Sequence, residues 1–245
     1  MNKVEEFREL HAEGFFIMPN PWDIGSALAL QEQGFPALAS TSTAFARSIG
    51  KHDHEISRQR LVEHVAALVD AISVPLSVDS ENLFPHEDGG ITETVRQLAE
   101  AGAAGCSIED FNPRTKEIVA KELAAEAVAE AVEAARKYNI VLTARADNYF
   151  HGINNIDDTI ERLVSFEALG AEVLYAPNLT TIDDVKAVLA AINRPLNVLG
   201  SPRAPSMAEL KAAGVRRIST GGRLYWVAAQ AVADTARELL DDAGS

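Results

Sequence analysis

The chain has 245 residues, of which 47% are hydrophobic, and this length predicts that residues 1–245 form a single domain. A formal net charge of −14 repels phosphate backbones, and no stretch reaches the ~20 apolar residues of a membrane helix, so neither nucleic acid nor a membrane is an expected partner. A single cysteine excludes an intrachain disulfide and a cysteine-rich zinc site, and it fits a reducing cytoplasm.

Short apolar runs alternate with longer helical patterns along nearly the whole chain. Within the runs the apolar positions are almost continuous, as in the strands of a parallel sheet that are buried on both faces. Eight runs are expected to be strands: Phe15–Pro19, Ala37–Thr41, Leu76–Asp79, Gly105–Glu109, Val141–Arg145, Val173–Ala176, Leu196–Leu199 and Arg217–Thr220.

The segments between the runs have the apolar spacing of amphipathic helices. The clearest are Arg58–Ile72, Thr92–Ala101, Ala124–Tyr138, Asp157–Leu169, Ile182–Ile192, Ala208–Ala213 and Tyr225–Leu240. Glycines at capping positions end several of them, as at Gly170 and Gly214. No Gly-x-Gly-x-x-Gly follows the first strand. The pattern therefore predicts an α/β fold, a single-domain (β/α)8 TIM barrel rather than a doubly wound open sheet.

Acidic residues stand at the expected C-terminal ends of neighbouring strands, where the active sites of barrels lie. Asp79 and Glu81 are two residues apart and point to the same side of their strand, and the next strand brings Glu109 to the same rim. Three close carboxylates would raise one another's pKa values unless a cation neutralised them. Oxygen ligands without His or Cys suit Mg2+, with Mn2+ as an alternative. Helix-capping or solvated loop acids are the competing interpretation.

Arg145 ends the strand that follows Glu109 along the chain and faces the same rim. A guanidinium there can clamp a substrate carboxylate or form an ion pair within the acidic cluster, and the two roles are compatible. Asn197 is a further polar residue, on the seventh strand. Cys106 lies among small residues within a strand and is expected to be a core thiol. Surface positions are expected for three loop histidines whose spacing fits no zinc motif: His52, His54 and His86.

Several motifs follow the expected strands in a fixed order. They are Asn20-Pro21-Trp22-Asp23, Ser40-Thr41-Ser42-Thr43 with Ser48-Ile49-Gly50-Lys51-His52-Asp53, Asp79-Ser80-Glu81-Asn82, Ser107-Ile108-Glu109-Asp110 and Thr143-Ala144-Arg145-Ala146-Asp147. In this order and spacing the chain resembles the isocitrate lyase/phosphoenolpyruvate mutase superfamily over essentially its whole length. The resemblance implies a Mg2+-dependent barrel that makes or breaks a C–C or P–C bond beside an α-keto acid or its enolate.

The resemblance also implies roles for individual residues. Asp79, Glu81 and Glu109 would hold the metal, partly through water, and the segment 47–57 would be a gating loop that carries Asp53 toward it. Backbone amides at Ser42 and Thr43 would bind the substrate carboxylate. The expected substrate-binding residues are Thr41, Ser42, Thr43, Arg145 and Asn197, and the expected catalytic residues are Asp53, Arg145 and Glu109.

One departure from the superfamily bears on the reaction. Its isocitrate and methylisocitrate lyases carry a Lys-Lys-Cys-Gly-His-type loop after the fourth strand, whereas Phe111–Glu117 here contains neither Cys nor His. The expected function is a Mg2+-dependent lyase that acts on a C–C bond next to an α-keto acid carboxylate through an enolate-like intermediate. A mutase or hydrolase of the P–C bond of phosphonopyruvate, and a non-catalytic keto-acid-binding barrel, are the alternatives. The terminal helix has apolar residues on more than one face, and the resemblance implies that such a helix packs on a neighbouring subunit, so a homo-oligomer, a tetramer or a dimer, is expected.

Overall fold

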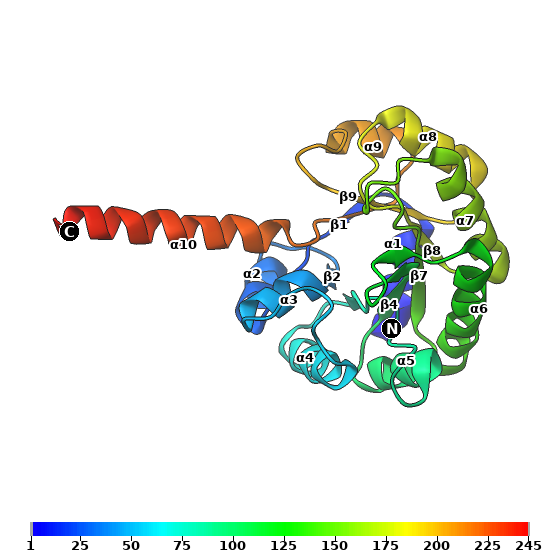
Figure 1. Cartoon of the computed structure of the whole chain (residues 1–245), viewed down its shortest axis with the longest axis horizontal. Coiled ribbons are helices and arrows are strands. Elements are labelled where there is room, and N and C mark those ends of the chain that lie inside the picture. The colour runs from blue at the N-terminus through cyan, green and yellow to red at the C-terminus, as the bar shows by residue number, and fades with distance from the viewer. Residues whose placement is uncertain (1, 245) are drawn as a thin grey trace.

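Eight parallel strands form one sheet in the order β1-β10-β9-β8-β7-β4-β3-β2, with helices around its outside (Figure 1). The structure is a computed structural model and describes residues 2–244. At the seam between β1 and β2, the Ala39 amide donates to the Pro19 carbonyl (3.0 Å), and Asn20 Nδ2 donates to the Ser40 carbonyl (2.7 Å). The sheet is therefore a nearly closed barrel, and the predicted α/β TIM-barrel fold is confirmed.

The strands of the barrel agree with the predicted ones to within two residues at either end. They are β1 (Phe16–Met18), β2 (Leu38–Ala39), β3 (Leu76–Val78), β4 (Gly105–Glu109), β7 (Val141–Arg145), β8 (Val173–Tyr175), β9 (Leu196–Leu199) and β10 (Arg217–Ser219). A short antiparallel hairpin of β5 (Phe111–Asn112) and β6 (Glu117–Ile118), which the sequence did not predict, follows β4.

The helices are α1 (Lys3–Ala12), α2 (Ile24–Glu32), α3 (Ser42–Ser48), α4 (Arg58–Ala71), α5 (Gly90–Glu100), α6 (Lys121–Tyr138), α7 (Ile156–Leu169), α8 (Ile182–Ala191), α9 (Met207–Ala213) and α10 (Arg223–Asp242). None of the seven segments named above as the clearest helices corresponds to α1, α2 or α3. Figure 1 shows α10 projecting away from the barrel as a long rod. Across residues 2–244, every helix is too short or too polar to span a bilayer.

The two faces of the barrel strands differ in polarity. Residues that point outward from the strands, such as Cys106, Leu142 and Ile218, belong to the main core under the helices, so the expected core thiol is confirmed. Inside the barrel, a smaller apolar cluster surrounds Phe7 of α1 and Phe16 of β1. The remaining inward positions are largely polar, because side chains alternate along each strand and the alternate positions hold Ser, Thr, Asn and Arg. This polar interior is open toward the functional site.

Candidate active site

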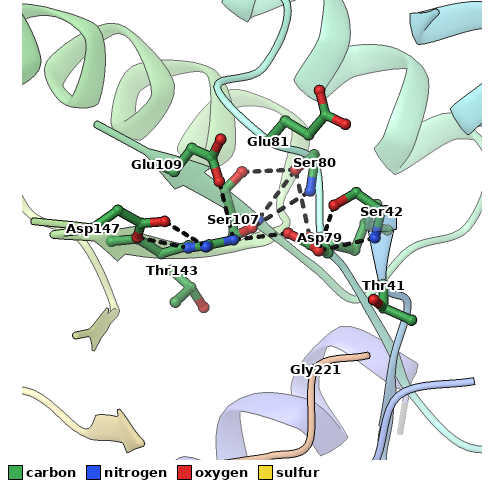
Figure 2. Close-up of polar contacts among 12 residues, drawn as sticks. Thr41, Ser42, Asp79, Ser80, Glu81, Ser107, Glu109, Thr143, Asp147 and Gly221 are labelled. Atoms are coloured by element: carbon green, nitrogen blue, oxygen red, sulfur yellow. Dashed lines mark hydrogen bonds and ion pairs between the residues drawn. The ribbon is translucent and has the colours of Figure 1, made fainter. Parts of the chain in front are cut away.

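Arg145 is the centre of an ionic cluster at the C-terminal ends of the strands, and Figure 2 labels its three acidic partners, Asp79, Glu109 and Asp147. It is the last residue of β7 and the register partner of Glu109, the last residue of β4. Its Nη1 lies 2.8 Å from Asp79 Oδ1 and 3.3 Å from Glu109 Oε2, and its Nη2 lies 2.6 Å from Asp147 Oδ2. Burial alone would lower the pKa of Arg145, but the Asp147, Glu109 and Asp79 carboxylates outweigh burial and raise it well above its usual value. The guanidinium is thus a permanent cation fixed by three acids.

Asp79 also connects the cluster to the start of α3. Both the backbone amide and the Oγ of Ser42 donate to Asp79 Oδ2, each at 2.9 Å. Thr41 is the N-cap residue of this helix, and its hydroxyl accepts from the Ala44 amide. The Ser42 amide, which the resemblance assigned to a substrate carboxylate, therefore binds a protein carboxylate in this conformation. The Ser42 hydroxyl also lies 3.4 Å from Asp53 Oδ1, which places Asp53 at the rim, while its role in a gating loop stays a prediction.

His54 lies between two of the acids, so its predicted surface position is wrong. Its Nδ1 is 3.3 Å from Glu81 Oε2 and 3.8 Å from Glu109 Oε1, and its side chain is 21% exposed. Burial alone would lower the pKa of His54, but the Glu81 and Glu109 carboxylates outweigh burial and raise it to about 9. The imidazole is therefore a second cation of the cluster at neutral pH. No local sequence signal distinguished it from the neighbouring loop histidines.

Negative charge in the cluster remains only partly compensated. Burial raises the pKa of Glu109 well above its usual range although Arg145 and His54 oppose this, and burial likewise raises the pKa of Glu81 against His54. Glu109 Oε1 is buried without a hydrogen-bond partner. An additional cation at this point would stabilise the ionised acids.

The predicted metal ligands have suitable chemistry but are not assembled around one point in this conformation. Among residues 2–244, no group of three or more His, Cys, Asp or Glu side chains is arranged to hold a metal ion. The two Asp79 oxygens face Arg145 and Ser42, whereas Glu81 lies beside His54 and points away from Asp79 (Figure 2). Glu81 also has a positive φ of 51°, which is uncommon outside glycine. Side chains would have to turn to bind Mg2+, so the ligand set Asp79, Glu81 and Glu109 stays a prediction.

A cavity of about 940 Å³ runs from this rim into the barrel. All of the predicted substrate-binding residues line it: Thr41, Ser42, Thr43, Arg145 and Asn197. Asn197 differs from the others because it lies deep in the barrel, where its Oδ1 accepts from Arg217 Nε at 2.9 Å. The cavity wall also contains His151, which stacks on Phe111 with ring centroids 3.7 Å apart. Sequence reasoning missed His151 and Arg217, because neither belongs to the motifs of the superfamily.

Known proteins match most or nearly all of the chain. The phosphoenolpyruvate phosphomutase family model matches residues 7–240. The crystal structure of a candidate lyase/mutase from Burkholderia cenocepacia J2315 is 44% identical, has a TM-score of 0.93, and covers 98% of this chain and 88% of that one. An oxaloacetate decarboxylase from Rhodopseudomonas palustris (strain TIE-1) is 29% identical over 191 residues, which are 75% of this chain and 65% of that protein.

A more distant structural neighbour contains the expected metal. The structure of phosphonopyruvate hydrolase in complex with oxalate and Mg2+ has a TM-score of 0.88 at 21% identity, and it covers 99% of this chain and 88% of that one. At this identity the likeness shows a shared fold. The neighbours of this barrel thus include a Mg2+ complex with a small dicarboxylate.

Proposed function

The chain belongs to the phosphoenolpyruvate phosphomutase family, and from this premise we propose that it is a Mg2+-dependent lyase that forms or cleaves a C–C bond next to an α-keto acid carboxylate. The observation that carries the proposal is the Arg145 guanidinium, held by three carboxylates at the mouth of the cavity. A cation fixed in this way can bind a substrate carboxylate with little reorganisation. The relative named as an oxaloacetate decarboxylase supports the choice of a keto acid.

Cleavage of a bond beside a carbonyl leaves an electron pair that delocalises onto the keto oxygen as an enolate. The residues of this chain would stabilise the developing charge through Arg145 and through the Ser42 and Thr43 amides, provided that Ser42 is released from Asp79. Asp53 would act at the rim from the gating loop, where it faces the Ser42 hydroxyl, and would hold or move a proton there. Closure of that loop would exclude water from the cavity.

Asp79, Glu81 and Glu109 would hold the Mg2+ ion, with Mn2+ as an alternative. The Glu109 Oε1 atom, which has no hydrogen-bond partner, and the raised pKa of Glu81 support a cation at this place. When bound, the ion would offset negative charge on the keto acid. His54 would have to leave Glu81 and Glu109, because it occupies the space between them as a competing cation.

The second candidate is a mutase or hydrolase of a P–C bond, acting on phosphonopyruvate or phosphoenolpyruvate, and the family description favours it. The charges at the rim favour a carboxylate instead. The acids Asp53, Asp79, Glu81, Glu109 and Asp147 surround only two cations, Arg145 and His54, within the cluster described above. A dianionic phosphonate would be repelled more strongly than a monoanionic carboxylate by this excess of acids.

A substrate panel with Mg2+ separates the candidates. The panel contains α-keto acids, their C–C adducts and phosphonopyruvate, and the release of pyruvate, CO2, glyoxylate and phosphate is measured. We expect release of a keto acid or CO2 without phosphate. Phosphate release from phosphonopyruvate alone, or its isomerisation to phosphoenolpyruvate, would support the P–C alternative. Thermal stabilisation by oxalate with Mg2+, without turnover of any compound, would identify a non-catalytic binding barrel.

The proposed partners are small carboxylates and further copies of this chain. The apolar side chains of α10 are exposed: Trp226 (49%), Val227 (62%), Val232 (70%) and Leu239 (66%). Since α10 extends away from the barrel, these side chains are available to another copy (Figure 1). We propose a homo-oligomer, a tetramer or a dimer, while the cytoplasmic location remains a prediction from composition.

A further inference from the structure

A row of inward-pointing side chains connects the ionic cluster at the rim to the lower part of the barrel. Arg145 is the register partner of Tyr175, Tyr175 of Asn197, and Asn197 of Arg217. Because the strands of a barrel tilt and stagger, each step along this row moves further from the rim. The row starts at the C-terminal residue of β7 and ends at the N-terminal residue of β10. It therefore places a second guanidinium, that of Arg217, deep inside the barrel.

Arg217 differs from Arg145 because it has only neutral partners. Its Nε donates to Asn197 Oδ1 (2.9 Å), its Nη2 donates to Thr143 Oγ1 (3.1 Å), and its Nη1 lies 3.1 Å from His11 Nε2. His11 Nδ1 is 2.7 Å from the Phe7 carbonyl and so carries the proton, which leaves Nε2 as the acceptor. Burial and Arg217 lower the pKa of His11 to about 3, so the ring is neutral.

No carboxylate within residues 2–244 forms an ion pair with Arg217, although only 2% of this residue is exposed. Burial lowers its pKa to about 9, which still leaves it charged at neutral pH. Three of the five N–H groups of the guanidinium have partners, and the others have none among these residues. A buried charge without a counter-charge is strongly unfavourable, so an anion that reached this point would be bound firmly.

The cavity gives an anion a route to Arg217. Arg145 at the rim and Arg217 below line the same cavity. Apart from the larger Tyr175, the wall between them has small or polar side chains: Ser77, Ser107, Thr143, Asn197 and Ser219. In most barrels of this type the interior is filled by bulky branched residues. Thr143 is in contact with Arg217 and lies two residues before Arg145 on the same side of β7, a spacing of roughly 6.5 Å along the strand, which is the scale of a short carbon chain.

We propose that Arg217, with Asn197 and Thr143, forms a carboxylate subsite inside the barrel, and that the substrate is a dicarboxylate whose distal carboxylate enters this subsite. The inference rests on the proposed function only for the keto-acid end, which stays at the rim. Arg217 would then determine specificity, since it selects a chain that ends in an anion over one that ends in a methyl group.

Calorimetric binding to the wild-type protein with Mg2+ tests the subsite with two keto acids of equal length. α-Ketoglutarate ends in a carboxylate and α-ketovalerate in a methyl group. We expect the diacid to bind at least about tenfold more tightly, which is the usual scale of a hydrogen-bonded charge pair. Equal affinities, including the case in which neither compound binds, would overturn the inference. This comparison does not depend on any variant and so remains decisive if a variant fails to fold.

Two variants test whether the preference for the diacid arises at Arg217. In Arg217→Gln the preference for the diacid should fall to less than about twofold, because the counter-charge is gone. Arg216→Gln makes the same change one residue earlier, where the guanidinium contacts the Gly14 carbonyl outside the polar interior, and it should keep the full preference. Retention of the preference in Arg217→Gln would also overturn the inference. Oxalate is too short to reach Arg217, so its binding with Mg2+ tests the site at the rim alone. If oxalate did not bind, the proposed function would be contradicted, but the subsite would not.

Discussion

His54 Nδ1 lies 3.3 Å from Glu81 Oε2, so a residue of the predicted gating loop is paired with a predicted metal ligand. The pairing raises the pKa of His54 from 6.5 to about 9. A raised histidine pKa contributes stability that is fully present below pH 6.5 and is lost as the pH rises through about 9. We therefore expect the difference in unfolding free energy between wild type and His54→Asn, measured with EDTA, to shrink across this window. A difference that is constant from pH 6 to about 9.5 would contradict the pairing.

Mg2+ should change the titration of His54 in a defined direction. A bound ion would compete with the imidazole for Glu81 and Glu109, so the pKa of His54 should fall when Mg2+ is added. NMR titration of the His54 ring with and without Mg2+ measures this shift directly. His86, in the loop after β3, is a control whose ring resonances should not respond to Mg2+. An unchanged His54 pKa at saturating Mg2+ would place the metal elsewhere.

Glu109→Gln should weaken Mg2+ binding by at least about tenfold while the fold stays intact. The substitution removes a buried carboxylate, one oxygen of which has no hydrogen-bond partner. The stability gained by removing this buried charge offsets the loss of the 3.3 Å ion pair with Arg145. We therefore expect the unfolding free energy without metal to lie within about 1 kcal/mol of wild type. Calorimetry with Mg2+ and denaturant unfolding measure the two quantities.

Glu117→Gln is the matched control, because Glu117 is an exposed acid on the nearby hairpin. It should leave Mg2+ affinity unchanged. Equal Mg2+ affinity in wild type and Glu109→Gln would remove Glu109 from the ligand set.

The barrel could be predicted from the sequence because its signals are local. Apolar runs such as Val141–Arg145 and glycine caps such as Gly170 depend on residues a few positions apart, and the strands follow them closely. The acids of the rim could be found because they follow strand ends. His54 could not, because its environment is set by Glu81 and Glu109, which come from other strands and leave no trace in the loop.

The burial of Arg217 inside the barrel could not be predicted for a different reason. Within the run Arg217–Thr220 this arginine reads as a polar residue at the start of a strand, a position that is often solvent-exposed. Its burial follows from α1, whose His11 covers it from below, and α1 was not predicted as a helix. The orientation of the predicted metal ligands could not be predicted from the sequence either, because the pairing of Asp79 with Ser42 and Arg145 depends on side-chain geometry.

Asp53→Ala should lower kcat by at least roughly a hundredfold, the scale of losing one positioned acid–base or electrostatic group. Asp53 reaches the rim through the Ser42 hydroxyl at 3.4 Å, from a loop rather than from a strand end. Mg2+ affinity should therefore change much less than in Glu109→Gln. Asp88→Ala removes an exposed acid from the loop after β3 and should leave kcat unchanged. A kcat for Asp53→Ala within about threefold of wild type would make Asp53 an ordinary loop acid.

The exposed apolar stripe on α10, the face of the helix that contains Val232 and Leu239, should hold copies of the chain together. Val232 and Leu239 are seven residues apart, two helical turns, so they lie on one face, while Glu238 lies roughly 100° around the helix from Leu239. Val232→Glu places a charge in the middle of that face, where burial against another copy would leave it unpaired. We expect light scattering to show a dimer or tetramer for wild type and a smaller species for Val232→Glu at micromolar concentration. Ala231→Glu adds the same charge toward the side of Glu238 and should keep the wild-type mass. A wild-type monomer would contradict the predicted assembly and would show that the stripe on α10 faces solvent.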